Sequence, residues 1–160
     1  MPLYTRRGDT GTTTLFGEIR VEKDSPHIEV CGHLDELSAS LGMVRAEGLP
    51  AEYEAIVLRI QQEIISFCAE IVSDSAKIQL EHIRQIETEI DRIEGELPPL
   101  TQFIISGENQ ISALLHLSRT ICRRAERSLV TLFRVRQKSP HLVAYLNRLG
   151  DLLFVMARAC

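Results

Sequence analysis

The sequence lacks several features that define common classes of protein. It has no apolar run near the roughly 18 residues that a membrane span requires, and no signal-peptide core follows its first residues. Its four cysteines, Cys31, Cys68, Cys122 and Cys160, have the spacing of neither a metal site nor a redox motif. We therefore expect no membrane partner, and we expect reduced thiols in a cytoplasmic protein.

An excess of positive charge is also missing. The 22 acidic residues outnumber the 18 basic ones, which gives a formal net charge of -4 at pH 7. A chain of this charge has no general affinity for nucleic acid, so any anion site must come from arginines clustered locally. The length of 160 residues predicts a single domain with its own core. We expect an N-terminal loop over residues 1–24 and a helical part over residues 25–160.

The familiar motifs of several enzyme classes are absent. No Gly-Lys-Ser/Thr follows the glycines near the N-terminus, so the chain has no P-loop. Paired Glu-x-x-His motifs for a di-iron site are missing, as is the His and Cys spacing of a zinc site. No nucleophilic triad can be placed from spacing. The pattern also shows no strand–helix–strand repeat, which argues against a Rossmann site.

Apolar residues recur at three- and four-residue steps, which predicts amphipathic helices. Leu34, Leu37, Leu41 and Val44 form one such stripe. The expected helices cover about residues 26–47, 51–73, 78–95, 107–135 and 140–160, and glycine or proline marks every break except the one near residues 74–77. Short connections between five such helices predict an all-α, up-and-down five-helix bundle of the ferritin-like kind. One short strand is expected near residues 19–22.

Residues 4–17 combine glycines, threonines and arginines, and predict a loop rather than a helix or strand. Gly8 and Gly11 allow positive φ and a close approach of the backbone to a ligand. Exposed amides in such a turn can form an anion nest, to which Arg6 and Arg7 add charge. A cradle for a triphosphate is chemically plausible here, but composition alone favours a polar tail that frays.

The fourth predicted helix has a polar stripe beside its apolar face. At 100° per residue, Arg119, Arg123 and Glu126 fall within about 60° of one another. Two guanidiniums one turn apart can bind a polyphosphate, and Glu126 can orient one of them or help to hold a metal. Spacing alone nevertheless favours a solvated face with ordinary ion pairs.

Three further groups of residues are candidates. Asp35 and Glu36 can pair with an arginine of the fourth helix, within the chain or across an interface, or can simply complement a helix dipole. Asn147 and Asp151 interrupt an apolar run, which indicates a polar network or a site. Phe103 lies just before the fourth helix and either enters the core or faces a ligand.

Three blocks of sequence, in this order, resemble the propanediol-utilization type of ATP:cob(I)alamin adenosyltransferase over nearly the whole chain. They are Tyr4–Gly17 with Arg20–Asp24, Gly32–Leu37 with Leu41-Gly42, and Arg119–Arg127 with Tyr145–Phe154. The resemblance implies transfer of the 5′-deoxyadenosyl group of ATP to cob(I)alamin with Mg²⁺ present. It also implies a homotrimer of five-helix bundles with sites between subunits, and an ATP-binding loop over residues 1–24.

The resemblance assigns roles to individual residues. Asp35 and Arg119 match a salt bridge across the subunit interface, and Phe103 matches a phenylalanine that packs beneath the corrin and keeps its lower ligand away. Arg123 and Lys23 would stabilise the leaving triphosphate. The positions that match ATP contacts are Thr5, Arg6, Gly8, Asp9, Gly11, Thr12, Lys23, Arg123, Glu126 and Asn147.

The chain departs from the family pattern below the expected corrin. It reads Phe103-Ile104-Ile105-Ser106-Gly107-Glu108 where the family usually reads Phe-Ile-Leu-Pro-Gly-Gly. This departure leaves open a non-catalytic corrinoid carrier or ATP-responsive regulator on the same fold, and a purely structural bundle is a third reading. For the enzyme, a corrinoid reductase and an adenosylcobalamin-dependent enzyme are the expected protein partners.

Overall fold

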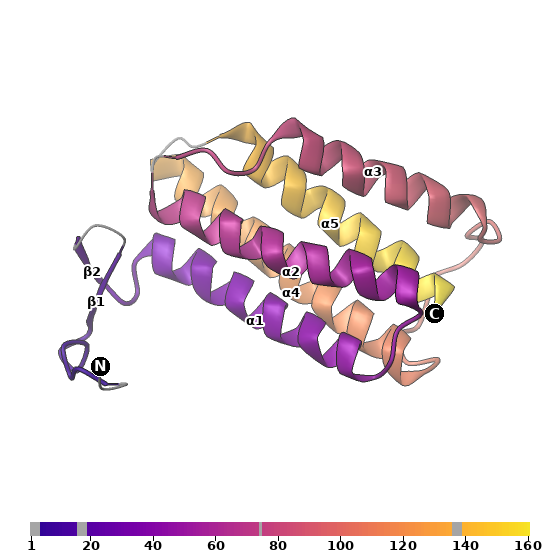
Figure 1. Cartoon of the computed structure of the whole chain (residues 1–160), viewed down its shortest axis with the longest axis horizontal. Coiled ribbons are helices and arrows are strands. Elements are labelled where there is room, and N and C mark those ends of the chain that lie inside the picture. The colour runs from indigo at the N-terminus through magenta and orange to yellow at the C-terminus, as the bar shows by residue number, and fades with distance from the viewer. Residues whose placement is uncertain (1–3, 16–18, 74, 136–138) are drawn as a thin grey trace.

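The computed structural model describes residues 4–15, 19–73, 75–135 and 139–160. Within these ranges the chain forms five helices: α1 Pro26–Ala46, α2 Ala51–Val72, α3 Leu80–Gly95, α4 Gln110–Val135 and α5 Pro140–Ala159. Successive helices run in alternating directions (Figure 1). The all-α, up-and-down bundle expected from the periodicity is therefore confirmed, and every predicted helix end lies within three residues of the observed one.

The start of α4 shows the largest of these differences. Gly107, the predicted first residue, has φ +116 and belongs to the turn before the helix. Asn109 caps the helix instead, because its side-chain Oδ1 accepts a hydrogen bond from the Ser112 amide at 2.9 Å. A residue in the left-handed region cannot lie inside a right-handed helix, so the turn ends before the cap.

A small antiparallel hairpin precedes the bundle. Strand β1, Thr12–Thr14, pairs with β2, Arg20–Glu22, with Thr13 opposite Val21. The predicted strand near residues 19–22 is confirmed, whereas the loop predicted over 4–17 is wrong at β1. Three consecutive threonines are β-branched and suit a strand once a partner is present. Figure 1 shows the hairpin beyond one end of the bundle, ahead of α1.

The core lies between packed pairs of helices. α1 packs against α2 and α4, while α5 packs against α3 and α4. All four residues of the predicted α1 stripe are fully buried, and Leu115, Leu129 and Leu132 are the corresponding buried residues of α4. The four cysteines are unpaired. None of the helices in the described ranges is long and apolar enough to cross a membrane.

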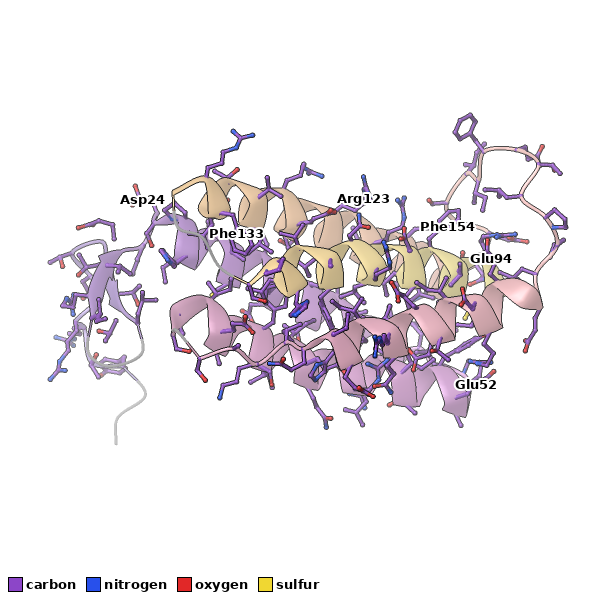
Figure 2. The ribbon with its side chains drawn as sticks, turned by 90° about the horizontal axis from the view of Figure 1, so that it is seen from above. Asp24, Glu52, Glu94, Arg123, Phe133 and Phe154 are labelled. Atoms are coloured by element: carbon purple, nitrogen blue, oxygen red, sulfur yellow. The ribbon has the colours of Figure 1, made fainter. Side chains whose placement is uncertain are left out.

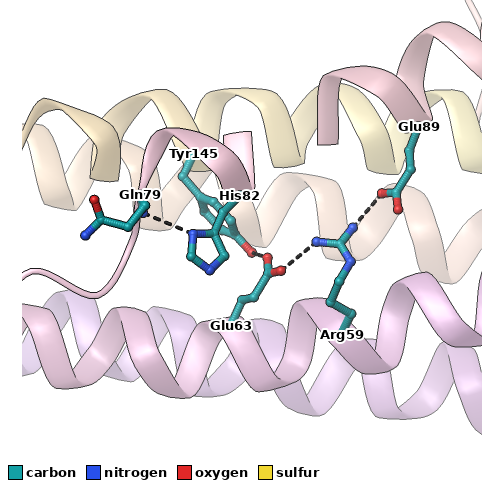
Figure 3. A network of polar contacts seen from close by, with 6 residues as sticks. All are labelled: Arg59, Glu63, Gln79, His82, Glu89 and Tyr145. Atoms are coloured by element: carbon teal, nitrogen blue, oxygen red, sulfur yellow. Dashed lines mark hydrogen bonds and ion pairs between the residues drawn. The ribbon is translucent and has the colours of Figure 1, made fainter. Parts of the chain in front are cut away.

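A polar network lies inside this core (Figure 3). The Glu63 carboxylate on α2 is buried and accepts hydrogen bonds of 2.6 Å from the Tyr145 hydroxyl on α5 and from Arg59. Arg59 also donates to Glu89 on α3 at 2.5 Å. Burial, and then the neighbouring Glu63 carboxylate, raise the pKa of Tyr145 well above its usual value, so the hydroxyl stays protonated and donates. The network joins α2, α3 and α5.

Replacing Tyr145 with phenylalanine tests the strength of this network. Tyr145→Phe leaves a buried carboxylate with one donor fewer, and we expect the free energy of unfolding to fall by about 1–3 kcal/mol in urea denaturation. The control is Tyr53→Phe, a buried tyrosine of α2 outside the network, for which we expect a change of about 0.5 kcal/mol or less. Equal losses in the two variants would show that the Glu63 contact does not stabilise the fold.

Candidate functional site

α4 presents a stripe of guanidiniums at four-residue steps. Arg123 and Arg127 are exposed and Arg119 is half-buried. An open depression of about 360 Å³ runs along this face, lined by Arg123, Glu126, Arg127, Val130, Thr131 and Arg134. Arg123 also passes over α5 where Gly150 lies, since a Cβ added at Gly150 would be 3.8 Å from the arginine Cγ. Arg123 and Glu126 of the stripe predicted from the sequence therefore line a cationic depression suited to a polyphosphate, whereas Arg119 is not part of its lining.

A chain of hydrogen bonds extends from this depression across α5 to α3. Asn147 donates to the Glu126 carboxylate at 3.2 Å and accepts from Arg148 at 2.8 Å. Arg148 in turn donates to Glu87 on α3 at 2.9 Å and lies 3.8 Å from Asp151. The polar network expected around Asn147 and Asp151 is present. It orients both Glu126 and Asn147 at the edge of the depression.

The N-terminal turn forms a second candidate surface. Gly11 has φ +88, as its predicted role requires, and Arg6 has φ +59. Gly8 does not have the positive φ that we expected of it. It allows Lys23 to approach the backbone closely, because a Cβ at this position would be 3.3 Å from the Lys23 ammonium nitrogen. The turn thus brings Lys23 against the backbone of Gly8, and Asp9, Thr10 and Gly11 are exposed. A cation beside exposed backbone is an arrangement that binds anions.

Phe103 belongs to a third surface, on the segment between α3 and α4. Its side chain is fully exposed, at 101 % of the reference area, and Ile105 is 90 % exposed. Residues 97–105 border a depression of about 520 Å³ together with Glu108, Ser112, Ala157 and Arg158. Arg158 fixes the start of this segment by donating to the Pro98 carbonyl at 2.6 Å. Phe103 is therefore not a core residue, and exposed apolar side chains at a cavity are typical of a binding surface.

These three surfaces lie at different heights along the bundle. Figure 2 shows Asp24 beside the hairpin at one end, Arg123 near the middle, and Glu94 towards the segment that contains Phe103 at the other end. α4 has 26 residues and is therefore about 39 Å long. Within one chain, the turn and Phe103 do not meet.

Asp35 and Arg119 are not brought together within the chain. Asp35 is exposed on α1, and no ion pair of the described residues joins it to Arg119. The Arg119 Nε is buried and finds no hydrogen-bond partner in the described part of the chain. It is Glu36 that pairs with the fourth helix, through Arg124. Glu36, the neighbour of Asp35, therefore forms the expected ion pair between an acidic residue of α1 and an arginine of α4.

The sequence reasoning missed His116 of α4. Its side chain is 4 % exposed, and neither ring nitrogen has a partner among the residues described. The imidazole lies 6.0 Å from the Phe154 ring, and the Arg119 guanidinium lies 5.8 Å from the same ring. Burial, and then the charge of Arg119, lower the pKa of His116. The sequence signal that could have identified this residue is a single histidine on an apolar helix face, one turn before Arg119.

His116 gives the fold a pH dependence. Because its pKa is lowered in the folded chain, the unfolded chain binds more protons near the ordinary histidine pKa of 6.5. The stability that the neutral His116 contributes is fully present above this pH and is lost as the pH decreases below it. We expect the unfolding free energy of His116→Phe to decrease less between about pH 7 and pH 5 than that of the wild type. Parallel pH profiles from chemical denaturation would contradict this assignment.

The described residues offer no preformed metal centre. No group of three His, Cys, Asp or Glu side chains in these ranges is close enough to hold a metal ion.

Comparison with known proteins gives one consistent result. The family model described as cobalamin adenosyltransferase matches residues 3–160. The corrinoid adenosyltransferase PduO of Salmonella typhimurium is 40 % identical over 166 residues, covering 99 % of this chain and 49 % of that protein. A corrinoid adenosyltransferase of Bacillus subtilis is 39 % identical, over 99 % of this chain and 86 % of its own length. The chain thus spans about half the length of the PduO relatives of Salmonella and Citrobacter freundii that it matches.

Solved structures agree with the sequence matches. A PduO-type ATP:corrinoid adenosyltransferase from Lactobacillus reuteri superposes with a TM-score of 0.90. It is a variant in which histidine replaces a phenylalanine, and it is complexed with cobalamin and ATP. It is 28 % identical, and the match covers 99 % of this chain and 90 % of the other. A second variant of a PduO-type adenosyltransferase from the same organism, in which lysine replaces an arginine, is complexed with ATP and gives a TM-score of 0.89. It is 29 % identical, and the match covers 98 % of this chain and 92 % of the other.

Proposed function

This chain belongs to the cobalamin adenosyltransferase family, and from that premise we propose that it transfers the 5′-deoxyadenosyl group of ATP to cob(I)alamin. The products are adenosylcobalamin and triphosphate. The observation that supports this most strongly is the guanidinium stripe of α4 beside the hydrogen-bonded pair of Glu126 and Asn147. It is a site for a polyphosphate without a nucleophile of its own.

The reaction suits such a site. The electron pair of cobalt(I) attacks the ribose C5′, the cobalt–carbon bond forms, and the bond from C5′ to the phosphate oxygen breaks. Triphosphate leaves with the electron pair of the broken C5′–O bond. The protein need only hold C5′ against cobalt and stabilise the charge that develops on the leaving group. Arg123 and Lys23 are the cations proposed for the second task.

ATP is proposed to bind between the two cationic surfaces. On the hairpin side the residues are Thr5, Arg6, Gly8, Asp9, Gly11, Thr12 and Lys23; on the helix side they are Arg123, Glu126 and Asn147. The hydrogen bond between Glu126 and Asn147 holds both side chains in place before the nucleotide arrives. Mg²⁺ carried by the triphosphate would add positive charge beside the leaving group.

The separation of the surfaces supports a shared site in a homotrimer. C5′ must touch cobalt, yet the hairpin and the segment between α3 and α4, which contains Phe103, lie at opposite ends of one bundle. A hairpin therefore works with the helices of a neighbouring subunit, where Phe103 packs beneath the corrin. Asp35 and Arg119, which form no ion pair with each other among the described residues, would meet across that interface, and the buried Nε of Arg119 would gain a partner. Light scattering should give three times the mass of the chain.

The wider context is proposed on the same basis. Residues 1–160 form a single cobalamin adenosyltransferase domain. Cobalt(I) needs an external electron donor, so a corrinoid reductase is a partner, and an adenosylcobalamin-dependent enzyme takes the product. The four unpaired cysteines suit a reducing compartment such as the cytoplasm.

Product analysis tests the proposed reaction. With ATP and chemically reduced cob(I)alamin, we expect one triphosphate for each alkylated corrinoid and no ADP. A carrier or regulator on the same fold would bind both molecules and release no triphosphate. That outcome would point to the departure at residues 103–108 and would reject the transferase.

A further inference from the structure

The side chain of Arg20, on β2, bridges the two ends of the N-terminal turn. Its Nη2 donates to the backbone carbonyl of Arg7 at 2.7 Å and also to the Thr12 hydroxyl. Arg7 and Thr12 flank residues 8–11, so one guanidinium closes the turn from outside. None of the roles proposed above uses this residue.

The turn has few other restraints. Its two internal backbone hydrogen bonds, from Asp9 to Arg6 and from Gly11 to Gly8, are both 3.3 Å long, beyond the usual range for N–H···O bonds. Arg6 has a left-handed backbone, which costs free energy for a residue other than glycine. Asp9, Thr10 and Gly11 are exposed, so no packing fixes them. Such a turn keeps a single conformation only with external support.

β2 and the residue after it supply that support at two points. Arg20 stands opposite Thr14 in the strand ladder, which fixes the base of its side chain. Lys23 donates its backbone N–H to the Gly11 carbonyl at 2.9 Å and places its ammonium group beside Gly8. The Arg20 side chain therefore anchors the turn at Arg7 and Thr12, while Lys23 anchors it at Gly11.

We infer that Arg20 is a positioning residue for the nucleotide: it holds residues 8–11 in the shape that presents their amides and Lys23 to the triphosphate. Arg20 acts through the turn and not by contact with the triphosphate. The inference rests on the proposed function of the turn. The positioning role requires a planar, preorganised donor that serves two acceptors in fixed geometry. The guanidinium of arginine provides such a donor, and the flexible, rotating ammonium of lysine does not.

Arg20→Lys separates this role from a direct charge contact, because it keeps the charge and removes the guanidinium. We expect the KM for ATP to rise about tenfold, while kcat at saturating ATP stays within about twofold and the KM for the corrinoid is unchanged. The control is Arg84→Lys, the same exchange at an exposed site of α3, which should match the wild type. A wild-type KM for ATP in Arg20→Lys, or a loss of kcat with unchanged KM, would overturn the inference.

Limited trypsin digestion tests the hold on the turn without nucleotide or activity. Arg6 and Arg7 offer cleavage sites at the turn itself, and Arg20→Lys conserves the third site. We expect cleavage after Arg7 in the nucleotide-free protein to be several-fold faster in Arg20→Lys than in Arg84→Lys, with both melting at the wild-type temperature. Equal cleavage rates would refute the anchoring. A wild type that does not bind ATP would instead refute the proposed function, while the cleavage rates would still report on Arg20.

Discussion

Arg123→Ala should lower kcat/KM for adenosyl transfer by about a hundredfold or more. The guanidinium lies on the exposed face of α4, beside the ordered pair of Glu126 and Asn147, where triphosphate charge is proposed to develop. Loss of a preorganised cation raises the barrier to departure of the leaving group. Since Arg123 is exposed and its aliphatic stem lies beside Gly150 of α5, we expect the unfolding free energy to change by less than about 1 kcal/mol.

The matched control removes an arginine of similar exposure from another face. Arg84→Ala on α3 has the same change of charge and lies outside the depression along α4. It should retain wild-type turnover. If the two variants proved equally active, the assigned role of Arg123 at the phosphate would be wrong; if Arg123→Ala failed to fold, the loss of activity would say nothing about charge, and the melting curve detects this.

Phe103→Ala should lower turnover by about a hundredfold while leaving the affinity for ATP unchanged. The ring is fully exposed on the segment after α3, far from the hairpin, so its removal disturbs neither the core nor the nucleotide surface. In the proposed site it packs beneath the corrin and excludes the lower ligand and water. Anaerobic turnover and calorimetric titration with ATP measure the two quantities separately.

Ile105→Ala is the control for apolar area on the same segment. Ile105 is nearly as exposed as Phe103 but is not the position that matches the family's phenylalanine. We expect its turnover to stay within about threefold of the wild type. If Ile105→Ala lost as much activity as Phe103→Ala, the segment would act only as a general apolar surface. Full activity in Phe103→Ala would exclude the ring from the site.

The helices were predictable because their information is local. An apolar stripe such as Leu34, Leu37, Leu41 and Val44 specifies both the element and its buried face, and glycine or proline marks the ends. The β1 strand was not predictable in this way, since Thr12–Thr14 becomes a strand only through its partner at Arg20–Glu22. The start of α4 depended on a choice between Gly107 and Asn109, which the backbone conformation of the turn decides.

The candidate site was predicted as a set of residues but not as an arrangement. Periodicity places Arg119, Arg123 and Glu126 on one face, and the structure adds Asn147 as the partner of Glu126. No local pattern tells that the hairpin and Phe103 lie at opposite ends of the bundle. The nitrogens of His116 and Arg119 that are buried without a partner among the described residues are likewise consequences of packing, which composition does not report.

One measurement tests the central claim most directly: the absorption spectrum of chemically reduced cob(I)alamin, followed without oxygen after addition of the protein and Mg²⁺-ATP. The account predicts protein-dependent conversion to a light-sensitive alkylcobalamin, accompanied by release of triphosphate. An unchanged cob(I)alamin spectrum, with saturable binding of both ATP and the corrinoid, would contradict it.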